Sequence, residues 1–448
     1  MSHEFVKRVR IRNYKSLASC DVELGAFTLL VGRNGSGKSN FLDALRFVTD
    51  GLQTSLDHAV KSRGGIDEVR RRSTGHPHNF QIELDLSLEG FRQANYRFEI
   101  GSQKRGGFLV KHESLRISRP SGGIAEHYEV TEGVVKAFDV GCGNGPSTAQ
   151  AIPPESTDEL SFSREPASSA ARTVGDSLNP IAANGASPSV VAPPAAPDRL
   201  YLVNAAGFPP FREVYDGLVA MGFYNLNPQQ MKEVQTPDAG ELLRRDGSNL
   251  ASVLARLEDV PERKERIREY LQAIVPGVVD FSRKQLGNRE TLEFRQLVQG
   301  AHNPWRFYAA SMSDGTLRVL GILVATMQLA GIQKPVRLVG IEEPETALHP
   351  AAAGALMECL REAAANTQIL ITTHSPELLD EVNIDADNLL VVEFEQGITQ
   401  IAPVDAASLG AIRDYLVTPG ELLRKDQLRA NRDHLQKSLA FGGMDETS

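Results

Sequence analysis

The segment Gly32–Ser39, with the sequence GRNGSGKS, constrains the fold more than any other part of this 448-residue chain. The apolar run at 27–31 before it is typical of a buried strand, and Phe41, Leu42 and Leu45 follow it at helical spacing. A glycine-rich turn between a strand and a helix lets backbone N–H groups surround phosphate oxygens, while the helix contributes its positive end. In this context the pattern G-x-x-x-x-G-K-[ST] predicts a phosphate-binding loop.

The loop also assigns roles to individual side chains. Lys38 would hold the β- and γ-phosphates of ATP, and Ser39 would ligate Mg²⁺. A chance glycine-rich turn is the competing interpretation, and the flanking strand and helix argue against it. The predicted nucleotide-binding residues are Asn34, Gly35, Gly37, Lys38, Ser39 and Asn40.

A second buried strand ends in two carboxylates, in the segment VRLVGIEEPE. The residues before this pair are almost all apolar, so a solvated helix face does not explain it. Beside a phosphate-binding loop, Glu342 would orient Mg²⁺, and Glu343 would polarise the attacking water as general base. The sequence therefore predicts a metal-side acid at Glu342 and a catalytic base at Glu343.

Two further positions gain meaning from these motifs. His374 follows the apolar run QILITT, at the edge where ligands of parallel sheets gather, and would hold the attacking water near the γ-phosphate. Ser313, Asp314 and Gly315 begin a helix whose hydroxyl, N–H groups and dipole suit an anion. Taken alone, each is an ordinary structural feature: a lone histidine and a well-capped helix.

The overall composition limits where the chain works. It has 48 basic and 57 acidic residues, for a net charge of −9, so any nucleic-acid contact must be local. Cys20, Cys142 and Cys359 share no metal-ligand spacing and predict neither zinc nor a disulfide framework. No secretory signal is evident, and the most apolar window, Leu317–Ala330, is too short to cross a bilayer. We expect a cytoplasmic protein without a membrane partner.

The remaining pattern outlines the architecture. Strands are expected at Glu4–Arg12, Phe80–Leu88 and Asn95–Ile100, the last two in an antiparallel sheet. The region 141–198, rich in Pro, Ser, Ala and Gly, reads as an insertion or long loop. Helices are expected from Ala239 to Leu257, from Pro261 to Ile274, from Asp314 to Ala330 with Ser313 as cap and Gly331 as stop, and after Pro350.

The order of these motifs resembles the ATP-binding-cassette ATPases, and within them the AAA-type predicted ATPases related to chromosome-maintenance and recombination-repair heads. The residues that carry the resemblance are IRNYKSL and the phosphate loop, SDGTLR in place of the transporter LSGGQ, IEEPETALHP and TTHSPELL, with GELLRRDGSNLASVLARL in the middle region. It covers residues 1–117 and 300–423. It implies an α/β P-loop NTPase fold: an ABC-type head with a mixed core sheet, an antiparallel β subdomain and a small helical lobe.

The resemblance also suggests a division of the chain. Its parts are an N-terminal ATPase lobe (1–117), an insertion (118–200), a helical lobe (201–300), a C-terminal ATPase lobe (301–423) and a tail (424–448). Gln81 is a candidate for the glutamine that connects the lobes in relatives. The resemblance further implies ATP and Mg²⁺ as cofactors and a homodimer in which Ser313, Asp314 and Gly315 of one subunit touch the γ-phosphate bound by the other.

Several functions are compatible with these motifs. The leading hypothesis is a homodimerising ATPase that couples ATP binding and hydrolysis to DNA engagement or to a partner such as an effector nuclease, in DNA repair or anti-phage defence. Lys7–Arg12 and Lys61–Arg72 are candidate DNA contacts, with solvated surface as the alternative. The alternative function is a nucleotide-gated regulatory protein without DNA contact. A transporter ATPase subunit fits the motifs least.

Overall fold

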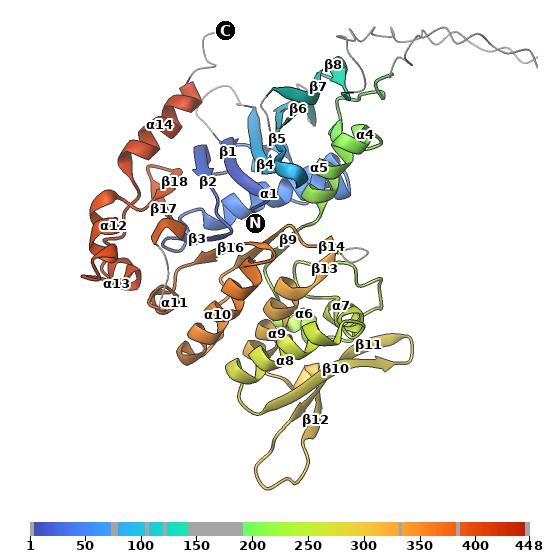
Figure 1. Cartoon of the computed structure of the whole chain (residues 1–448), viewed down its shortest axis with the longest axis vertical. Coiled ribbons are helices and arrows are strands. Elements are labelled where there is room, and N and C mark those ends of the chain that lie inside the picture. Colours follow the sequence, from blue (N-terminus) through green and yellow to red (C-terminus); the bar gives the residue numbers. More distant parts are fainter. Residues whose placement is uncertain are drawn as a thin grey trace, which may run out of the picture.

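The computed structural model describes residues 4–72, 79–103, 107–119, 123–141, 191–330, 334–381 and 386–443. Within these residues, one mixed sheet of 13 strands forms the centre of the molecule (Figure 1). In sheet order its strands are β8 (Val134–Asp139), β7 (Ile124–Thr131), β6 (Phe108–Ser118), β5 (Gln93–Ser102), β4 (Phe80–Ser87), β1 (Val6–Tyr14), β2 (Leu17–Glu23), β18 (Ile398–Pro403), β17 (Leu389–Glu395), β3 (Phe27–Val31), β16 (Gln368–Thr373), β15 (Leu338–Glu342) and β9 (Met221–Tyr224).

The run of strands from β17 to β9 is parallel and buried. Leu29 of β3 is in register with Ile371 of β16, which is in register with Ile341 of β15. All five residues of β3 are buried, as expected for a parallel strand covered on both faces. Because these strands run in the same direction, their carboxyl ends meet at one edge, where the segments after β3, β15 and β16 lie side by side.

The part of the sheet from β8 to β2 is antiparallel, and β2 pairs parallel with β18. It contains the strands expected at 4–12, 80–88 and 95–100, which are confirmed as β1, β4 and β5. The sheet continues beyond residue 117, because β7 pairs antiparallel with β6, and β8 pairs antiparallel with β7. The segment from 118 to 139 therefore extends the antiparallel sheet rather than beginning an insertion. Most of the expected insertion, 142–190, lies outside the described residues.

In the described part of its N-terminal half, the chain forms five helices that accompany this sheet. After the phosphate loop come α1 (Lys38–Gln53), α2 (Leu56–Lys61) and α3 (Ile66–Val69), and later α4 (Leu202–Ala205) and α5 (Pro209–Val219). A 3-10 turn, Glu89–Phe91, links β4 to β5. Gln81 is buried in β4 and accepts a hydrogen bond from Arg97, so it lies in the antiparallel sheet and not between lobes. The chain enters the second lobe instead at Asn225, directly after β9.

The second lobe is not purely helical. Its helices are α6 (Pro228–Lys232), α7 (Leu250–Leu257), α8 (Pro261–Ile274) and α9 (Asp314–Met327), and it also holds a three-stranded antiparallel sheet of β10 (Val278–Leu286), β11 (Arg289–Gln296) and β12 (Trp305–Tyr308) (Figure 1). A 3-10 turn, Ala309–Ser311, leads into α9. The sheet places Phe281, Phe294 and Phe307 in register. Many charged residues lie between these aromatics in the sequence, so the alternation typical of strands is weak in this region.

Two expected helices have different bounds. The helix expected from Ala239 begins only at Leu250, because Asn249 holds the preceding segment in turns by accepting from the Arg244 N–H and donating to the Leu242 carbonyl. The helix expected to reach Ala330 ends at Met327, where Gln328 is extended and accepts from the Leu243 N–H. Its expected stop, Gly331, lies outside the described residues. A short pair, β13 (Leu329–Ala330) and β14 (Lys334–Pro335), follows.

The C-terminal part completes the sheet and closes over it. A 3-10 turn (Pro350–Ala352) leads into α10 (Ala353–Ala364), and α11 (Pro376–Leu379), a 3-10 turn (Ala386–Asn388), α12 (Ala406–Arg413), α13 (Pro419–Arg424) and α14 (Arg432–Gly443) follow. Helix α14 is anchored to β2, because its His434 contacts the Asp21 carbonyl at 2.7 Å. Among the described residues, no helix combines the length and apolar character needed to cross a bilayer.

The cysteines take no part in a metal or disulfide site within the described residues. Cys20 and Cys359 are free and buried, and burial raises the pKa of the Cys359 thiol to about 12. Cys142 lies outside those residues.

Candidate active site

The loop after β3 has the backbone shape that a phosphate cradle requires. Gly35 and Gly37 have φ values of 78° and 102°, a region that disfavours side chains. A Cβ on Gly37 would lie 2.0 Å from the Thr399 Oγ1 atom, so the position also needs glycine for space. Because α1 begins at Lys38, its first N–H groups have no acceptor within the helix. Asn34 and Ser39 are exposed on the same loop.

Lys38 lies over this loop. Its Nζ donates to the carbonyls of Gly32 at 2.7 Å and Arg33 at 3.0 Å. Burial lowers the pKa of this ammonium, and the nearby Glu343 and Glu345 act in the opposite direction. The ammonium therefore rests on neutral carbonyl oxygens, which an anion placed in the loop could replace as its partners.

A second set of residues supports the loop from behind, and nothing in the local sequence indicated it. The Thr399 Oγ1 atom of β18 donates to the Ser36 carbonyl at 2.9 Å and contacts the Ser16 hydroxyl at 2.7 Å. The side-chain amide of Asn40 donates to that same hydroxyl at 2.7 Å. The Asn40 side chain is thus engaged in holding α1 to the β1–β2 turn and to β18.

The predicted acidic pair lies where β15 ends. Glu342 is its last residue, and Glu343 follows with φ of 45°, an uncommon conformation for a non-glycine residue. The Glu343 N–H donates to the Thr372 carbonyl of β16 at 2.9 Å, which fixes this bend against the neighbouring strand. The bend sends the two consecutive carboxylates to different partners.

Glu343 faces the predicted histidine. The His374 Nδ1 atom lies 3.2 Å from the Glu343 Oε1 atom and 3.9 Å from the Glu345 Oε1 atom. Glu345 was not singled out in the sequence, although it is the third acid of IEEPE. It accepts a hydrogen bond from the Thr373 hydroxyl at 2.6 Å. Its side chain is 13% exposed, whereas that of Glu343 is 37% exposed. Glu345 thus joins the turn after β15, which carries Glu343, to the end of β16, which is followed by His374.

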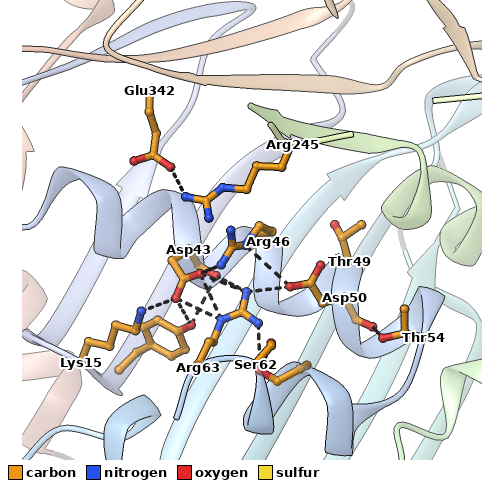
Figure 2. Close-up of polar contacts among 12 residues, drawn as sticks. Lys15, Asp43, Arg46, Thr49, Asp50, Thr54, Ser62, Arg63, Arg245 and Glu342 are labelled. Atoms are coloured by element: carbon orange, nitrogen blue, oxygen red, sulfur yellow. Dashed lines mark hydrogen bonds and ion pairs between the residues drawn. The ribbon is translucent and has the colours of Figure 1, made fainter. Parts of the chain in front are cut away.

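Glu342 has a partner from the second lobe. The Arg245 Nη2 atom donates to the Glu342 Oε1 atom at 2.7 Å (Figure 2). Arg245 belongs to the turn that replaces the expected helix, so its helical pattern gave no hint of this contact. The only signal was its place in the motif-like segment GELLRRDGSN.

A cluster of charges on α1 fixes that helix close to the Arg245 contact. Asp43 is surrounded by Lys15 at 2.5 Å, Arg46 at 2.5 Å and Arg63 at 3.0 Å (Figure 2), and it accepts from the Tyr14 hydroxyl at 2.8 Å. Burial alone would raise the pKa of Asp43, but these three cations together hold it well below its usual range. We call these five residues the Asp43 cluster.

The segment Ser313–Gly315 begins α9 as predicted. The Ser313 Oγ atom accepts from the Thr316 N–H at 3.1 Å, which confirms it as the helix cap. Asp314 pairs with Lys232 of α6 at 2.6 Å, and Gly315 packs so closely on the Ala347 carbonyl that a Cβ would lie 2.5 Å from it. Ser313 is exposed, and no hydrogen bond or ion pair between described residues joins it to the chain's own phosphate loop.

These residues fit ATP with Mg²⁺ on three counts. The Ser36 Oγ and Glu345 Oε2 atoms are buried without a hydrogen-bond partner. The loop offers free helix N–H groups to phosphate, and Ser39 with Glu342 offers oxygen ligands of the kind Mg²⁺ prefers. Among the described residues, no group of three or more His, Cys, Asp or Glu side chains is placed to hold a metal ion.

Comparison with known proteins identifies related sequences and folds. Residues 27–129 and 196–380, more than half of the chain, match the family described as "AAA domain, putative AbiEii toxin, Type IV TA system". A curated relative, the DNA replication and repair protein RecF of Gloeobacter violaceus, is 29% identical over 104 residues, which cover 22% of this chain and 27% of the relative. The chain therefore aligns with only about a quarter of that relative's length.

Solved structures give similar but distant matches. An Smc head bound to the C-terminal winged-helix domain of ScpA is 12% identical, with a TM-score of 0.46 over 90% of this chain and 99% of that one. The Smc head from Pyrococcus furiosus, with an extended coiled coil and bound to the C-terminal domain of ScpA, gives the same identity and TM-score over 92% and 99% of the two chains.

Proposed function

Because the chain belongs to this AAA-domain family of ATP-binding P-loop proteins, we propose that it hydrolyses ATP with Mg²⁺, using Glu343 as general base and His374 to hold the attacking water. Lys38 and the N–H groups of the loop would bind the phosphates. Glu342 and Ser39 would hold Mg²⁺, which neutralises charge on the β- and γ-phosphates when bound. Glu343 would accept the proton of the water that attacks the γ-phosphate.

One observation carries this proposal: the 3.2 Å contact between His374 and Glu343 at the carboxyl ends of adjacent parallel strands. β16, which precedes His374, also pairs with β3, which precedes the phosphate loop. Glu343, His374 and the glycine-rich loop therefore lie at one edge of the sheet, which supports the proposed roles.

The test uses Glu343→Gln, which keeps the shape of the side chain but not its basicity. We expect ATP turnover to fall about 10²- to 10⁴-fold, the range typical of losing a general base, while ATP binding is retained. Glu262→Gln on the exposed start of α8 is the matched control and should hydrolyse ATP at the wild-type rate. Unchanged turnover in Glu343→Gln would show that Glu343 is not the base.

We further propose that two copies assemble around ATP, with Ser313, Asp314 and Gly315 of one facing the phosphates of the other. The support is the exposed and capped start of α9, which is not used by the chain's own loop among the described residues. The molecular mass of Glu343→Gln in solution, with and without Mg·ATP, tests this. A dimer that forms only with nucleotide supports the assembly, and a constant monomer mass contradicts it.

For the output of the cycle, the structure favours the nucleotide-gated regulatory protein over DNA contact through the two basic stretches. Most of their cations are already paired with carboxylates of the same chain. In the first stretch Arg8 pairs with Asp21 and Arg10 with Glu83. In the second, the pairs are Lys61–Asp57, Arg63–Asp43, Arg70–Asp67 and Arg72–Glu68.

Titration with duplex DNA at several salt concentrations separates these outputs. Contacts to phosphates would make the affinity fall steeply with salt. If the Glu343→Gln protein loaded with Mg·ATP binds duplex in this way, DNA engagement is the output. If it does not, that result supports the nucleotide-gated regulatory protein without DNA contact.

A further inference from the structure

We propose that Arg245 is a positioning residue that competes with Mg²⁺ for Glu342 and so connects the metal side of the nucleotide site to the start of α9. This inference rests on the proposed function, because it assumes that Glu342 receives Mg²⁺. It adds a link that neither the motifs nor the matches to known proteins assign. The link runs from β15 through the turn at 244–247 and α6 to α9.

The first step is the contact itself. The Glu342 side chain is 15% exposed and its nearest charged partner is the Arg245 guanidinium at 2.7 Å. The guanidinium contacts one of the two Glu342 carboxylate oxygens, so Arg245 and Mg²⁺ would draw on the same negative charge. Mg²⁺ loading should therefore weaken the Arg245–Glu342 pair.

The second step is electrostatic. Arg245 lies close enough to Arg46 to lower the pKa of the Arg46 guanidinium, although burial is the larger cause. Figure 2 shows Glu342 on one side of the Arg245 guanidinium and Arg46 of the Asp43 cluster on the other. A divalent cation at Glu342 would leave Arg245 between positive charges, so repulsion would drive its side chain away.

The third step is mechanical, because the turn that carries Arg245 is fastened to the entrance of the second lobe. The Arg245 carbonyl accepts from the Asn225 N–H at 3.0 Å, and the Asp246 carbonyl accepts from the Asn227 N–H at 3.0 Å. Gly247, with φ of 79°, packs so closely on Met231 of α6 that a Cβ would lie 2.8 Å from its side chain. A movement of the turn that carries Arg245 would therefore shift the segment that begins α6.

The last step reaches Ser313–Gly315 at the start of α9. Asn227 caps α6 by accepting from the Gln229 N–H at 3.0 Å, and Lys232 at its other end pairs with Asp314 in the first turn of α9. These hydrogen bonds, ion pairs and the packing of Gly247 on Met231 form a continuous path of contacts. Occupancy of the metal site can thus bias the position of Ser313, the residue proposed to face a second copy.

The experiment compares Arg245→Gln with Arg244→Gln in the full chain. Arg244 is the matched control because it is the adjacent residue, carries the same charge and pairs with Asp238 at 3.0 Å instead of Glu342. Mn²⁺ is the probe for the metal, measured by its magnetic resonance signal with a non-hydrolysable ATP analogue. Removing a competing ion pair should make Arg245→Gln bind Mn²⁺ about 2- to 5-fold more tightly than wild type, and Arg244→Gln should match wild type.

Hydrogen exchange gives a second readout that needs neither metal nor nucleotide. In nucleotide-free protein, Arg245→Gln should raise exchange in residues 228–232 and 313–317 above wild type, and Glu342→Gln should do the same by removing the other partner. Arg244→Gln should not. The link is overturned if Arg245→Gln behaves like Arg244→Gln in both measurements. If the link fails in this way while the wild type still binds Mn²⁺ with the ATP analogue, the proposed ATPase function stands. If the wild type binds neither Mn²⁺ nor the analogue, both the link and the proposed ATPase function are overturned.

Discussion

The Asp43 cluster and the active-site carboxylates differ in how their charges are balanced. Around Asp43, three cations and a tyrosine hydroxyl surround one buried carboxylate. At the carboxyl ends of β15 and β16 lie three carboxylates, Glu342, Glu343 and Glu345. Among the described residues only Glu342 forms an ion pair with an arginine, and Glu343 and Glu345 lie near His374. Lys38 and Arg318 act on these carboxylates from a greater distance. The first arrangement is fully paired and holds α1 in place. In the second, a metal ion would add a direct positive partner.

The largest expected effect breaks the complete cluster. Asp43→Asn would take the ion-pair partner from Lys15 and leave Arg46 and Arg63 to Asp50 alone. We expect it to lower the free energy of unfolding by about 3 kcal/mol, the low end of the cost of breaking a buried pair. Urea unfolding measures this. The matched control, Asp57→Asn, removes an exposed pair with Lys61 and should cost at most about 1 kcal/mol. Equal losses in the two variants would mean that the Asp43 cluster is no more than surface charge.

Acid should expose the same difference. The pKa of Asp43 is held below its usual range in the folded protein, so its contribution to stability is present above its unfolded-state pKa of about 3.9. That contribution is lost as the pH falls below this value toward the folded-state pKa. Unfolding free energies at a series of pH values from neutral to 3 should therefore fall less steeply for Asp43→Asn than for wild type. Parallel profiles would contradict the assignment.

The smallest expected effect concerns the unbalanced carboxylates. Glu343→Gln removes one of three like charges at an exposed edge and should leave stability unchanged or raise it, by up to about 1 kcal/mol. Thermal unfolding without nucleotide measures this change. A clear loss of stability would mean that the Glu343 carboxylate contributes to folding, and the contrast with Asp43 would disappear.

The parts of the site that were predictable from the sequence are those with a local pattern. The phosphate loop, the acidic pair and His374 each follow an apolar strand, and parallel strands bring such positions together. Ser313 was predictable as a helix cap for the same reason. Their chemical roles remain predictions, although the structure places Glu343 and His374 in contact.

The parts that were missed depend on contacts distant in the chain. Arg245 lies in a turn whose leucine spacing predicted a helix. The turn forms because the Asn249 side chain hydrogen-bonds to its backbone. The Asp43 cluster joins α1 to residues on β1 and on the segment after α2. Thr399 approaches Ser36 across 363 residues of sequence. No periodicity in a short window can indicate partners of this kind.

That last separation sets an order of events as the chain is made. β3 and the loop after it leave the ribosome well before β16, β17 and the supporting Thr399. At a synthesis rate of about 5–20 residues per second, Ser36 is made roughly 20 to 70 s before Thr399. Until β18 has been made, the loop lacks the Thr399 hydrogen bond to Ser36, so the nucleotide site reaches its final shape only after that point in translation.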